Sequence, residues 1–407
     1  MKTTNQFISS INIRNFLSFG DQGESIFLEP LNVIIGPNGA GKSNLIEALN
    51  ILSATPKDLT SPVRDGGGIR EWLWKGVEGP PTATIEGILN FPEGIMPLRH
   101  RISFTMAGQR FEVVDEIVEN EKKQKANDKD VYFFYRYNKG NPVLNVRTEL
   151  TEQAGTAKGR IQRQLRREDI SPEQSVLSQR KDPDQYPEIT YLANKLSDIR
   201  FYREWNFGRY TAARMPQKTD SPEDFLLENA SNLGVVLNSL LSTSKTKKII
   251  LEKLKVFNDS FEDIATRIHS GTVQTIIHEK GLHEPVPATR LSDGTLRYVC
   301  LLAILCHPTP PPVICIEEPE LGLHPDILPV IAELLKEASK RTQLIVTTHS
   351  DVLVSALSDE PNAVMVCERN QSGTTLRRLE PKLLKSWLES YSLGEIWRMG
   401  EIGGNRW

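Results

Sequence analysis

The stretch GPNGAGKSN, residues 36–44, limits the possible folds more than any other part of this chain. It fits the pattern G-x-x-x-x-G-K-[ST], in which glycines let backbone N–H groups face phosphate oxygens at a helix N-terminus. The apolar segment LNVII before it is typical of a strand, and the segment after it places Leu45, Leu49 and Leu52 on one helical face. A chance Gly-rich turn would lack this context, so the sequence predicts a strand, a phosphate loop and a helix in succession.

The residue types in this loop predict nucleotide binding. Lys42 would reach the β- and γ-phosphates of ATP and assist catalysis, and the Ser43 hydroxyl would hold Mg²⁺. The predicted nucleotide contacts are Gly36, Pro37, Asn38, Gly39, Ala40, Gly41, Lys42, Ser43 and Asn44.

Two further apolar segments end in groups that suit this chemistry. PPVICI is followed by Glu317 and Glu318, and QLIV is followed, after two threonines, by His349. At a strand end of a P-loop fold, the first acid would hold Mg²⁺ and the second would accept a proton from the attacking water. A solvated acidic turn and a structural histidine are the alternatives. Because α/β sheets keep their ligands at such strand ends, we expect catalytic roles for Glu318 and His349 and a metal role for Glu317.

The stretch LSDGTLR, residues 291–297, resembles the signature motif of ABC-type ATPases, with the pattern Leu-Ser-x-Gly-x-x-Arg. Alone, Ser292 could be only a helix N-cap. The order along the chain is also that of this class: phosphate loop, signature, acidic strand end, strand-end histidine. The resemblance implies that Ser292 and the backbone of Gly294 contact the γ-phosphate of ATP held by a second subunit, in a head-to-head homodimer.

Within this class the chain looks like the SMC, RecF and OLD-like branch. INIRNFLSFGD, residues 11–21, is similar to that branch's opening strand and Asn-Phe turn, and EEPELGLHP, residues 317–325, resembles its OLD-type members. Glu317 stands where the wider class usually has Asp, and Leu17 stands where many relatives have Arg. Neither a long coiled coil nor a TOPRIM domain is expected, so nuclease chemistry would come from a separate partner chain.

The resemblance also implies a glutamine loop between the β-rich and the helical parts of the chain. EQSVLSQRKDP, residues 173–183, lies at that place, with Gln179 as the first choice and Gln174 as the second. The chosen glutamine would take part in catalysis and Mg²⁺ binding; surface glutamines in a loop are the alternative.

The expected fold class is α/β, an ABC-type P-loop head with an antiparallel β subdomain and a helical subdomain. β-type segments between residues 82 and 146, separated by turns such as FPEG, predict an antiparallel meander. Residues 172–265 have a largely helical pattern, and residues 271–288 resemble a hairpin. The expected units are a first lobe with the phosphate loop and β subdomain at 1–150, a helical or insert region at 151–270, a second lobe with the signature and acidic strand end at 271–380, and a tail at 381–407.

Composition excludes several classes of protein. Hydrophobic residues make up 39% and charged residues 25%, with a net charge of −3, as in soluble globular proteins. The longest apolar run, YVCLLAILC, falls short of the ~20 residues that a membrane span needs, and MKTTNQFISSINI has no apolar core of the kind found in secretory signals, so no such signal is expected. A cytoplasmic location without a membrane partner is therefore expected. The 4 cysteines show no CxxC pairing, which predicts buried free thiols.

Basic and aromatic segments raise the question of nucleic-acid contact. KGRIQRQLRRED, residues 158–169, would place Arg160, Arg163 and Arg167 on one helical face that could meet a DNA backbone, although a solvated helix is the alternative. The stretches REWLWKG and REWNFGRY indicate core packing or subunit contact rather than base stacking. The tryptophans of the tail would dock on this chain or on a partner.

These features predict an ATP-binding and hydrolysing protein that uses ATP and Mg²⁺. Its ATP-dependent dimerisation would drive a conformational signal in DNA-linked processes, either genome maintenance or anti-phage defence. The expected partners are a second copy of the chain, DNA, and a separately encoded nuclease or effector. Two alternatives remain open: a nucleotide-sensing scaffold with little turnover, and the ATPase subunit of a transporter.

Overall fold

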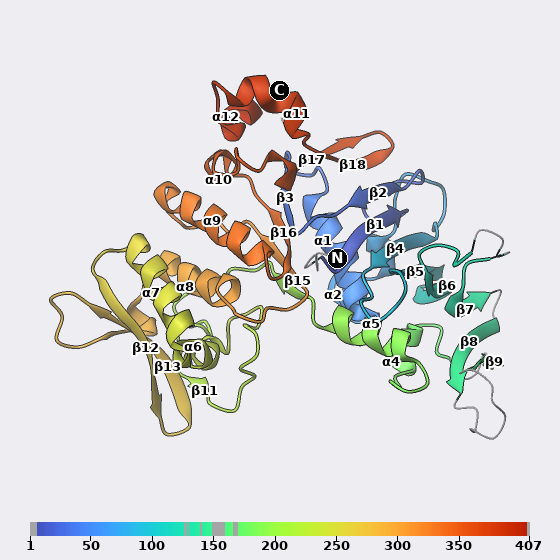
Figure 1. Cartoon of the computed structure of the whole chain (residues 1–407), viewed down its shortest axis with the longest axis horizontal. Helices are drawn as coiled ribbons and strands as arrows, with labels where there is room; N and C mark the ends of the chain where they lie inside the picture. Colours follow the sequence, from blue (N-terminus) through green and yellow to red (C-terminus); the bar gives the residue numbers. More distant parts are fainter. Residues whose placement is uncertain are drawn as a thin grey trace.

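A six-stranded sheet lies at the centre of the molecule (Figure 1), in a computed structural model that describes residues 6–125, 128, 130–138, 141–148, 159–165 and 170–404. In spatial order its strands are β10 (Arg200–Tyr202), β15 (Val313–Glu317), β16 (Gln343–Thr347), β3 (Leu31–Ile35), β17 (Val364–Asn370) and β18 (Gly373–Arg378). Neighbouring strands are parallel except in the hairpin of β17 and β18. Parallel strands are covered on both faces, which explains why β3 and β16 are wholly buried and mostly apolar.

Side chains of the central sheet alternate between two cores, one on each face. In β3, Val33 and Ile35 belong to the first core and Ile34 belongs to the second. The first core takes in α6 (Leu233–Ser242), α8 (Asp293–Leu305) and α9 (Leu328–Ser339), and the second takes in α1 (Lys42–Ala54) and α5 (Pro187–Ser197). The sheet is therefore the middle layer of three, as the apolar strands of the sequence predict.

An antiparallel sheet of eight strands packs over α1 through the second core. In spatial order its strands are β2 (Glu24–Phe27), β1 (Ile8–Arg14), β4 (Ala83–Leu89), β5 (Leu98–Ala107), β6 (Arg110–Asn120), β7 (Phe133–Asn138), β8 (Asn141–Thr148) and β9 (Gly159–Gln164). The meander predicted for residues 82–146 is confirmed. The helix predicted for residues 158–169 is wrong, because residues 159–164 pair with β8 as strand β9. Arg167 lies outside the described residues.

A third sheet forms the lobe at the lower left of Figure 1, beside α6 and α7 (Ser244–Phe257). Its strands are β11 (Gln217–Lys218), β13 (Thr272–Glu279), β12 (Phe261–His269) and β14 (Val286–Pro287). The predicted hairpin at 271–288 is present as β13 and β14. The helical pattern extended to residue 265 is wrong, because α7 ends at Phe257 and residues 261–269 pair along β13. Cross-strand pairing and the burial of Phe261 and Ile264 outweigh the local helical preference.

Short elements and the tail complete the chain. The short helices are α2 (Ser61–Asp65), α3 (Ile69–Trp72), α4 (Val176–Gln179) and α10 (Asp351–Ser355), with 3₁₀ turns at Ala288–Arg290, Pro325–Ile327 and Pro361–Ala363. The tail forms α11 (Pro381–Leu388) and α12 (Leu393–Arg398). Trp397 is only 8% exposed and docks on the chain's own first core, whereas Trp387 is 36% exposed and Trp407 lies outside the described residues.

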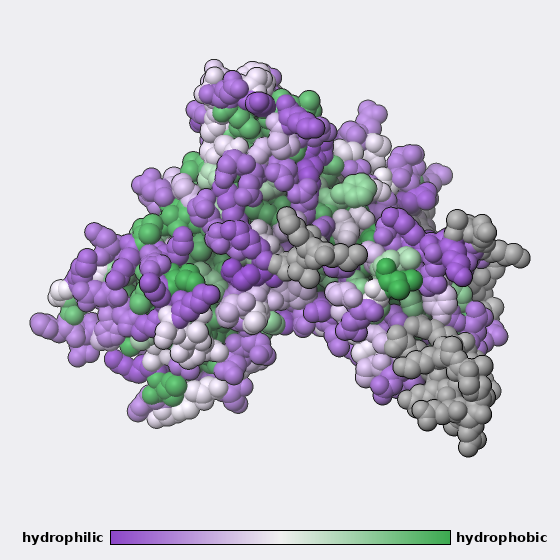
Figure 2. Space-filling model, viewed as in Figure 1, coloured by the Kyte–Doolittle hydropathy of each residue, from purple (hydrophilic) through white to green (hydrophobic). Residues whose placement is uncertain are grey.

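The surface and the cysteines agree with the composition. On the face seen in Figure 2, hydrophobic residues form separate patches among hydrophilic ones. All of the cysteines are buried free thiols, as predicted, and burial raises the pKa of Cys306 to about 11. Within the described parts of the chain, no helix has the length and apolar character that crossing a membrane requires.

Candidate functional site

The carboxyl ends of four parallel strands meet at one edge of the central sheet. The register pairs Glu317 of β15 with Thr347 of β16, and Thr347 with Ile34 of β3. On the other side of β15, Tyr202 of β10 pairs with Ile316. The segments that follow these strands, the phosphate loop among them, therefore emerge together, where open α/β sheets hold their ligands.

Glycines shape the loop between β3 and α1. Gly36 and Gly41 have φ angles of 149° and 111°, in the region that favours glycine. A Cβ at Gly36 would collide with the carbonyl oxygen of Cys367, and one at Gly41 would collide with the Thr374 side chain. The loop therefore lies tightly against the β17–β18 hairpin, with its backbone turned into the N-terminus of α1, as the motif predicts.

The first residue of α1, Lys42, is buried within this loop at 7% exposure. Its Nζ donates hydrogen bonds to the carbonyl oxygens of Gly36 at 2.8 Å and Pro37 at 3.1 Å. Burial lowers the pKa of Lys42, and the nearby charges of Glu317 and Glu318 are among those that oppose this shift. A positive group thus lies where a helix N-terminus already favours anions.

Ser43 and Glu317 form a pair of oxygen donors beside the loop. The Ser43 Oγ donates a hydrogen bond to Glu317 Oε2 at 3.1 Å. Burial raises the pKa of Glu317, and the bond from Ser43 partly offsets that rise. Hydroxyl and carboxylate oxygens are hard ligands of the kind that Mg²⁺ takes together with phosphate oxygens and water, and a half-buried carboxylate gains from a cation. These two residues therefore fit a Mg²⁺ site.

Glu318 and His349 face each other across the same edge. The carboxylate of Glu318 lies 3.8 Å from His349 Nε2, and both side chains are about one-third exposed, at 34% and 37%. Glu318 has a φ angle of 46°, an uncommon left-handed conformation for a glutamate, and its backbone N–H donates to the carbonyl oxygen of Thr347 at 2.9 Å. Burial lowers the pKa of His349, and the charge of Lys42 adds to this, which favours the neutral imidazole.

Glu320 fixes the turn that carries His349, a role that sequence reasoning missed. Its Oε1 accepts hydrogen bonds from the His349 backbone N–H at 2.8 Å and from the Thr348 hydroxyl at 2.6 Å. The residue lies within the EEPELGLHP stretch, and the signal available was a third acid two residues after Glu318.

Gln179, the predicted glutamine-loop residue, lies at the end of α4. Its Oε1 accepts from the Ser171 backbone N–H at 3.0 Å, and its Nε2 donates to the carbonyl oxygens of Gln174 and Ser175 at 3.3 Å. These bonds hold the side chain to its own loop. A catalytic or Mg²⁺-binding role for Gln179 or Gln174 stays a prediction.

The segment after β10 brings two other residues to the strand ends. Arg203 Nη1 donates to Glu47 Oε1 at 2.6 Å, one turn of α1 beyond Ser43, and the Trp205 indole donates to the carbonyl oxygen of Glu317 at 2.8 Å. Sequence reasoning missed both. The REWNFG stretch was visible, but β10 has only 3 residues, too few to show a strand pattern.

The signature stretch begins α8. Ser292 is the exposed N-cap, and its Oγ accepts from the Thr295 backbone N–H at 3.0 Å. A Cβ at Gly294 would approach the carbonyl oxygen of Gly322 to 2.8 Å, so a side chain there would require the neighbouring loop to shift. Buried Arg214 donates to the carbonyl oxygen of Leu291 and pairs with Asp293, which holds the stretch in place.

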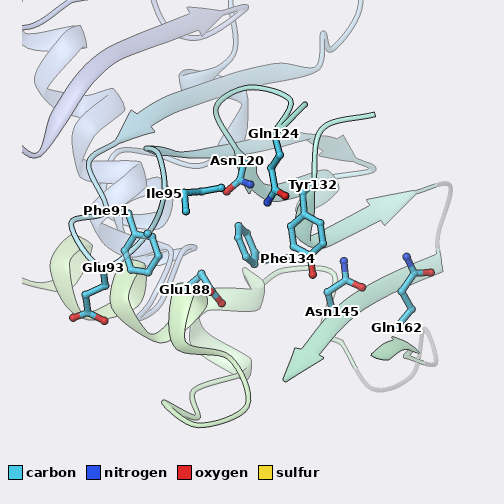
Figure 3. A pocket seen from close by; sticks show the side chains of 11 residues that line it. Phe91, Glu93, Ile95, Asn120, Gln124, Tyr132, Phe134, Asn145, Gln162 and Glu188 are labelled. Atoms are coloured by element: carbon cyan, nitrogen blue, oxygen red, sulfur yellow. The ribbon is translucent and has the colours of Figure 1, made fainter. Parts of the chain in front are cut away.

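A separate hollow of about 610 Å³ lies in the lobe of the eight-stranded sheet (Figure 3). Its walls include Phe91, Tyr132 and Phe134, the amide side chains of Asn120 and Asn145, and two glutamates. None of its lining residues is a lysine or an arginine. It therefore does not suit a phosphate group, in contrast to the loop around Lys42.

Comparisons with known proteins agree with this geometry. The model of the family described as "AAA domain, putative AbiEii toxin, Type IV TA system" matches residues 31–355. The Old nuclease of Escherichia phage P2 is 24% identical over 423 residues, covering 95% of this chain and 63% of that protein, so the chain spans less than two thirds of its length. The chromosome partition protein Smc of Clostridium kluyveri (strain NBRC 12016) is 46% identical over 43 residues, 11% of this chain and 4% of that protein.

Solved structures show the same fold. An SMC head bound to the C-winged helix domain of ScpA is similar with a TM-score of 0.56 at 15% identity, over 93% of this chain and 99% of that one. An SMC head with an extended coiled coil, bound to the C-terminal domain of ScpA derived from Pyrococcus furiosus, gives 0.56 at 13% identity, over 94% and 98%. The predicted α/β P-loop head is thus confirmed.

Proposed function

We propose that this chain, which belongs to the AAA domain family matched over residues 31–355, binds and hydrolyses ATP with Mg²⁺. The observation that carries the proposal is the meeting of a cation, an oxygen-donor pair and a carboxylate–imidazole pair at one sheet edge. These groups are Lys42, Ser43, Glu317, Glu318 and His349.

Each group has a role that follows from its position. Lys42 exchanges its two carbonyl partners for β- and γ-phosphate oxygens. Ser43 and Glu317 would hold Mg²⁺, which would neutralise charge on the same phosphates. Glu318 accepts a proton from the attacking water, and the neutral imidazole of His349 donates a hydrogen bond to the γ-phosphate.

We further propose that two chains complete each active site. Ser292 is exposed at the start of α8, and among the described residues no hydrogen bond joins it to the phosphate loop of its own chain. An exposed N-cap with a 13-residue helix behind it suits a γ-phosphate presented by a second subunit. ATP would close this dimer through Ser292 and Gly294, and hydrolysis would reopen it.

The wider role proposed is a conformational signal in genome maintenance or anti-phage defence, passed to DNA or to a separately encoded nuclease or effector. Its support is the family description, which names a toxin of a toxin–antitoxin system, and a relative that is named a nuclease. The expected partner can be sought by capturing proteins from native cells on a hydrolysis-deficient variant with and without ATP.

The substitution Glu318→Gln tests the hydrolytic function. It should slow ATP turnover about 10²- to 10⁴-fold, the usual contribution of a general base, which corresponds to about 3–5 kcal/mol of barrier. ATP binding should survive, because Lys42 and the loop are unchanged. The matched control is Glu337→Gln, at a 57% exposed side chain on α9. Turnover equal to that of the parent protein would remove Glu318 from its assigned role.

A further inference from the structure

Two hollows border the phosphate loop, and they differ in what lines them. One, of about 350 Å³, lies between the Asn-Phe turn of the N-terminal strand, the first turn of α1 and residues 71–76. The other, of about 550 Å³, lies between the loop itself and the β17–β18 turn. Arg369 lines both hollows. Glu317, Glu318 and His349 line neither, so both hollows are separate from the end of the site where hydrolysis is assigned.

The smaller hollow has an aromatic wall. Trp74 lines it together with Leu17, Asn44 and Lys75. Trp74 is only partly buried, in contrast to Trp72, which belongs to the second core. A Cβ at Gly76 would collide with this ring, so the glycine allows the indole to lie over the backbone. The larger hollow has no aromatic residue among those that line it.

The backbone fixes Trp74 relative to the phosphate loop. Its N–H donates to the carbonyl oxygen of Asn15 at 3.0 Å, and two residues earlier the carbonyl of Trp72 accepts from the Leu17 N–H at 2.8 Å. These bonds hold the Asn-Phe turn, which is also joined to α1, because Asn44 Nδ2 donates to Ser18 Oγ at 2.6 Å. The indole is therefore held beside the residue that directly follows Ser43.

The polar groups of this hollow indicate which part of a nucleotide it suits. The Asn44 amide is engaged with Ser18, and the Glu71 carboxylate is paired with Lys75. The Asn44 amide N–H and the Glu71 carboxylate thus already have partners within the chain. The Arg369 guanidinium, which lines both hollows, makes no side-chain hydrogen bond or ion pair within the described chain. Stacking on an aromatic face depends little on which base is stacked.

We propose that the hollow at Trp74 is the nucleobase subsite, which stacks a purine on the indole and discriminates only weakly between adenine and guanine. This rests on the proposed function, since it assumes that the loop at Lys42 holds the triphosphate. It revises the expectation that this aromatic stretch serves core packing or subunit contact rather than base stacking: Trp72 is 5% exposed and packs in the core, whereas Trp74 lines the hollow.

The test compares the affinities of ATP and of inorganic tripolyphosphate, which has no base. Trp74→Ala should weaken ATP binding about 5- to 100-fold, the effect of losing one stacked base, and should leave tripolyphosphate binding unchanged. Trp74→Phe should stay within about 3-fold of the parent for ATP, since a ring remains. GTP should bind within about 10-fold of ATP, because the base edge is not read. Trp387→Ala, at an exposed tryptophan of α11, is the matched control.

Two results would overturn the subsite. One is an unchanged ATP affinity in a folded Trp74→Ala protein, and the other is an equal loss of ATP and tripolyphosphate binding in that protein. If Trp74→Ala does not fold, intrinsic tryptophan fluorescence tests the subsite instead. ATP should quench the fluorescence of the parent protein but not that of Trp74→Phe, and tripolyphosphate should quench the fluorescence of neither protein. Equal quenching by ATP in both proteins contradicts the proposal. Lys42→Ala must weaken both ligands, and if it does not, the phosphate-loop assignment fails instead.

Discussion

The backbone at Glu318 allows a prediction that separates stability from catalysis. At a φ of 46°, any side chain with a Cβ meets its own backbone, at a cost of about 1–2 kcal/mol that glycine avoids. The conformation is held by the bond from the Glu318 N–H to the carbonyl oxygen of Thr347 at 2.9 Å. Glu318→Gly should therefore be more stable than Glu318→Ala by about 1 kcal/mol, since glycine's extra unfolded-state entropy offsets part of the gain. Both variants lack the carboxylate, so both should hydrolyse ATP as slowly as Glu318→Gln.

Urea unfolding followed by circular dichroism measures the difference, and two control sites calibrate it. Ser270, with a φ of 47° in the turn between β12 and β13, should show the same preference for glycine over alanine. Glu333, in the middle of α9, should show the opposite preference, by about 1 kcal/mol. If alanine equals or exceeds glycine at position 318 while both controls behave as expected, the left-handed backbone at the catalytic carboxylate is refuted.

Two further predictions concern the dimer and the acid pair. Ser292→Arg should abolish the ATP-dependent dimer of a Glu318→Gln protein, measured by light scattering, while sparing ATP binding. Ser390→Arg in the tail is the control. An undiminished dimer in the Ser292→Arg protein would contradict completion of the site by a second chain. Burial raises the pKa of Glu317 above its ordinary 4.5, so its ionisation destabilises the nucleotide-free fold once pH rises through that raised pKa. Glu317→Gln should therefore unfold at a higher urea concentration than the parent at pH 7 without Mg²⁺. This gain in stability should disappear as pH falls toward 4.5. A gain that persists at that pH would exclude ionisation of Glu317 as its cause.

The residues that sequence alone could predict are those whose roles follow from a local pattern. Glu317 and His349 follow apolar runs, and Lys42 lies in the glycine-rich motif that follows a third. The carboxyl ends of parallel strands share an edge, so the meeting of these residues could be expected. Trp205 could not be found this way. Its bond to the carbonyl oxygen of Glu317 spans 112 residues and depends on the 3-residue strand β10 pairing beside β15.

The two mistaken helices have a common physical cause. Phe261, Ile264 and Ile268 have a helical spacing, and so do Arg160 and Arg163, yet the two segments pair as strands with β13 and with β8. Such pairing is not encoded within the segment itself. The role of Gln179 is predicted from the order of motifs in a related family, and it stays a prediction.

Arg297 connects the signature helix to the acidic strand end. Its guanidinium lies 5.1 Å from the centre of the Trp205 ring and donates to the carbonyl oxygens of Leu321 and Trp205. Trp205 in turn donates to the carbonyl oxygen of Glu317. The residue is 6% exposed, and burial lowers its pKa, so its charge depends on these partners for solvation. A buried cation cannot give up such partners without a cost of several kcal/mol. Arg297 therefore links the helix that Ser292 begins to the segments that carry Trp205 and Glu317.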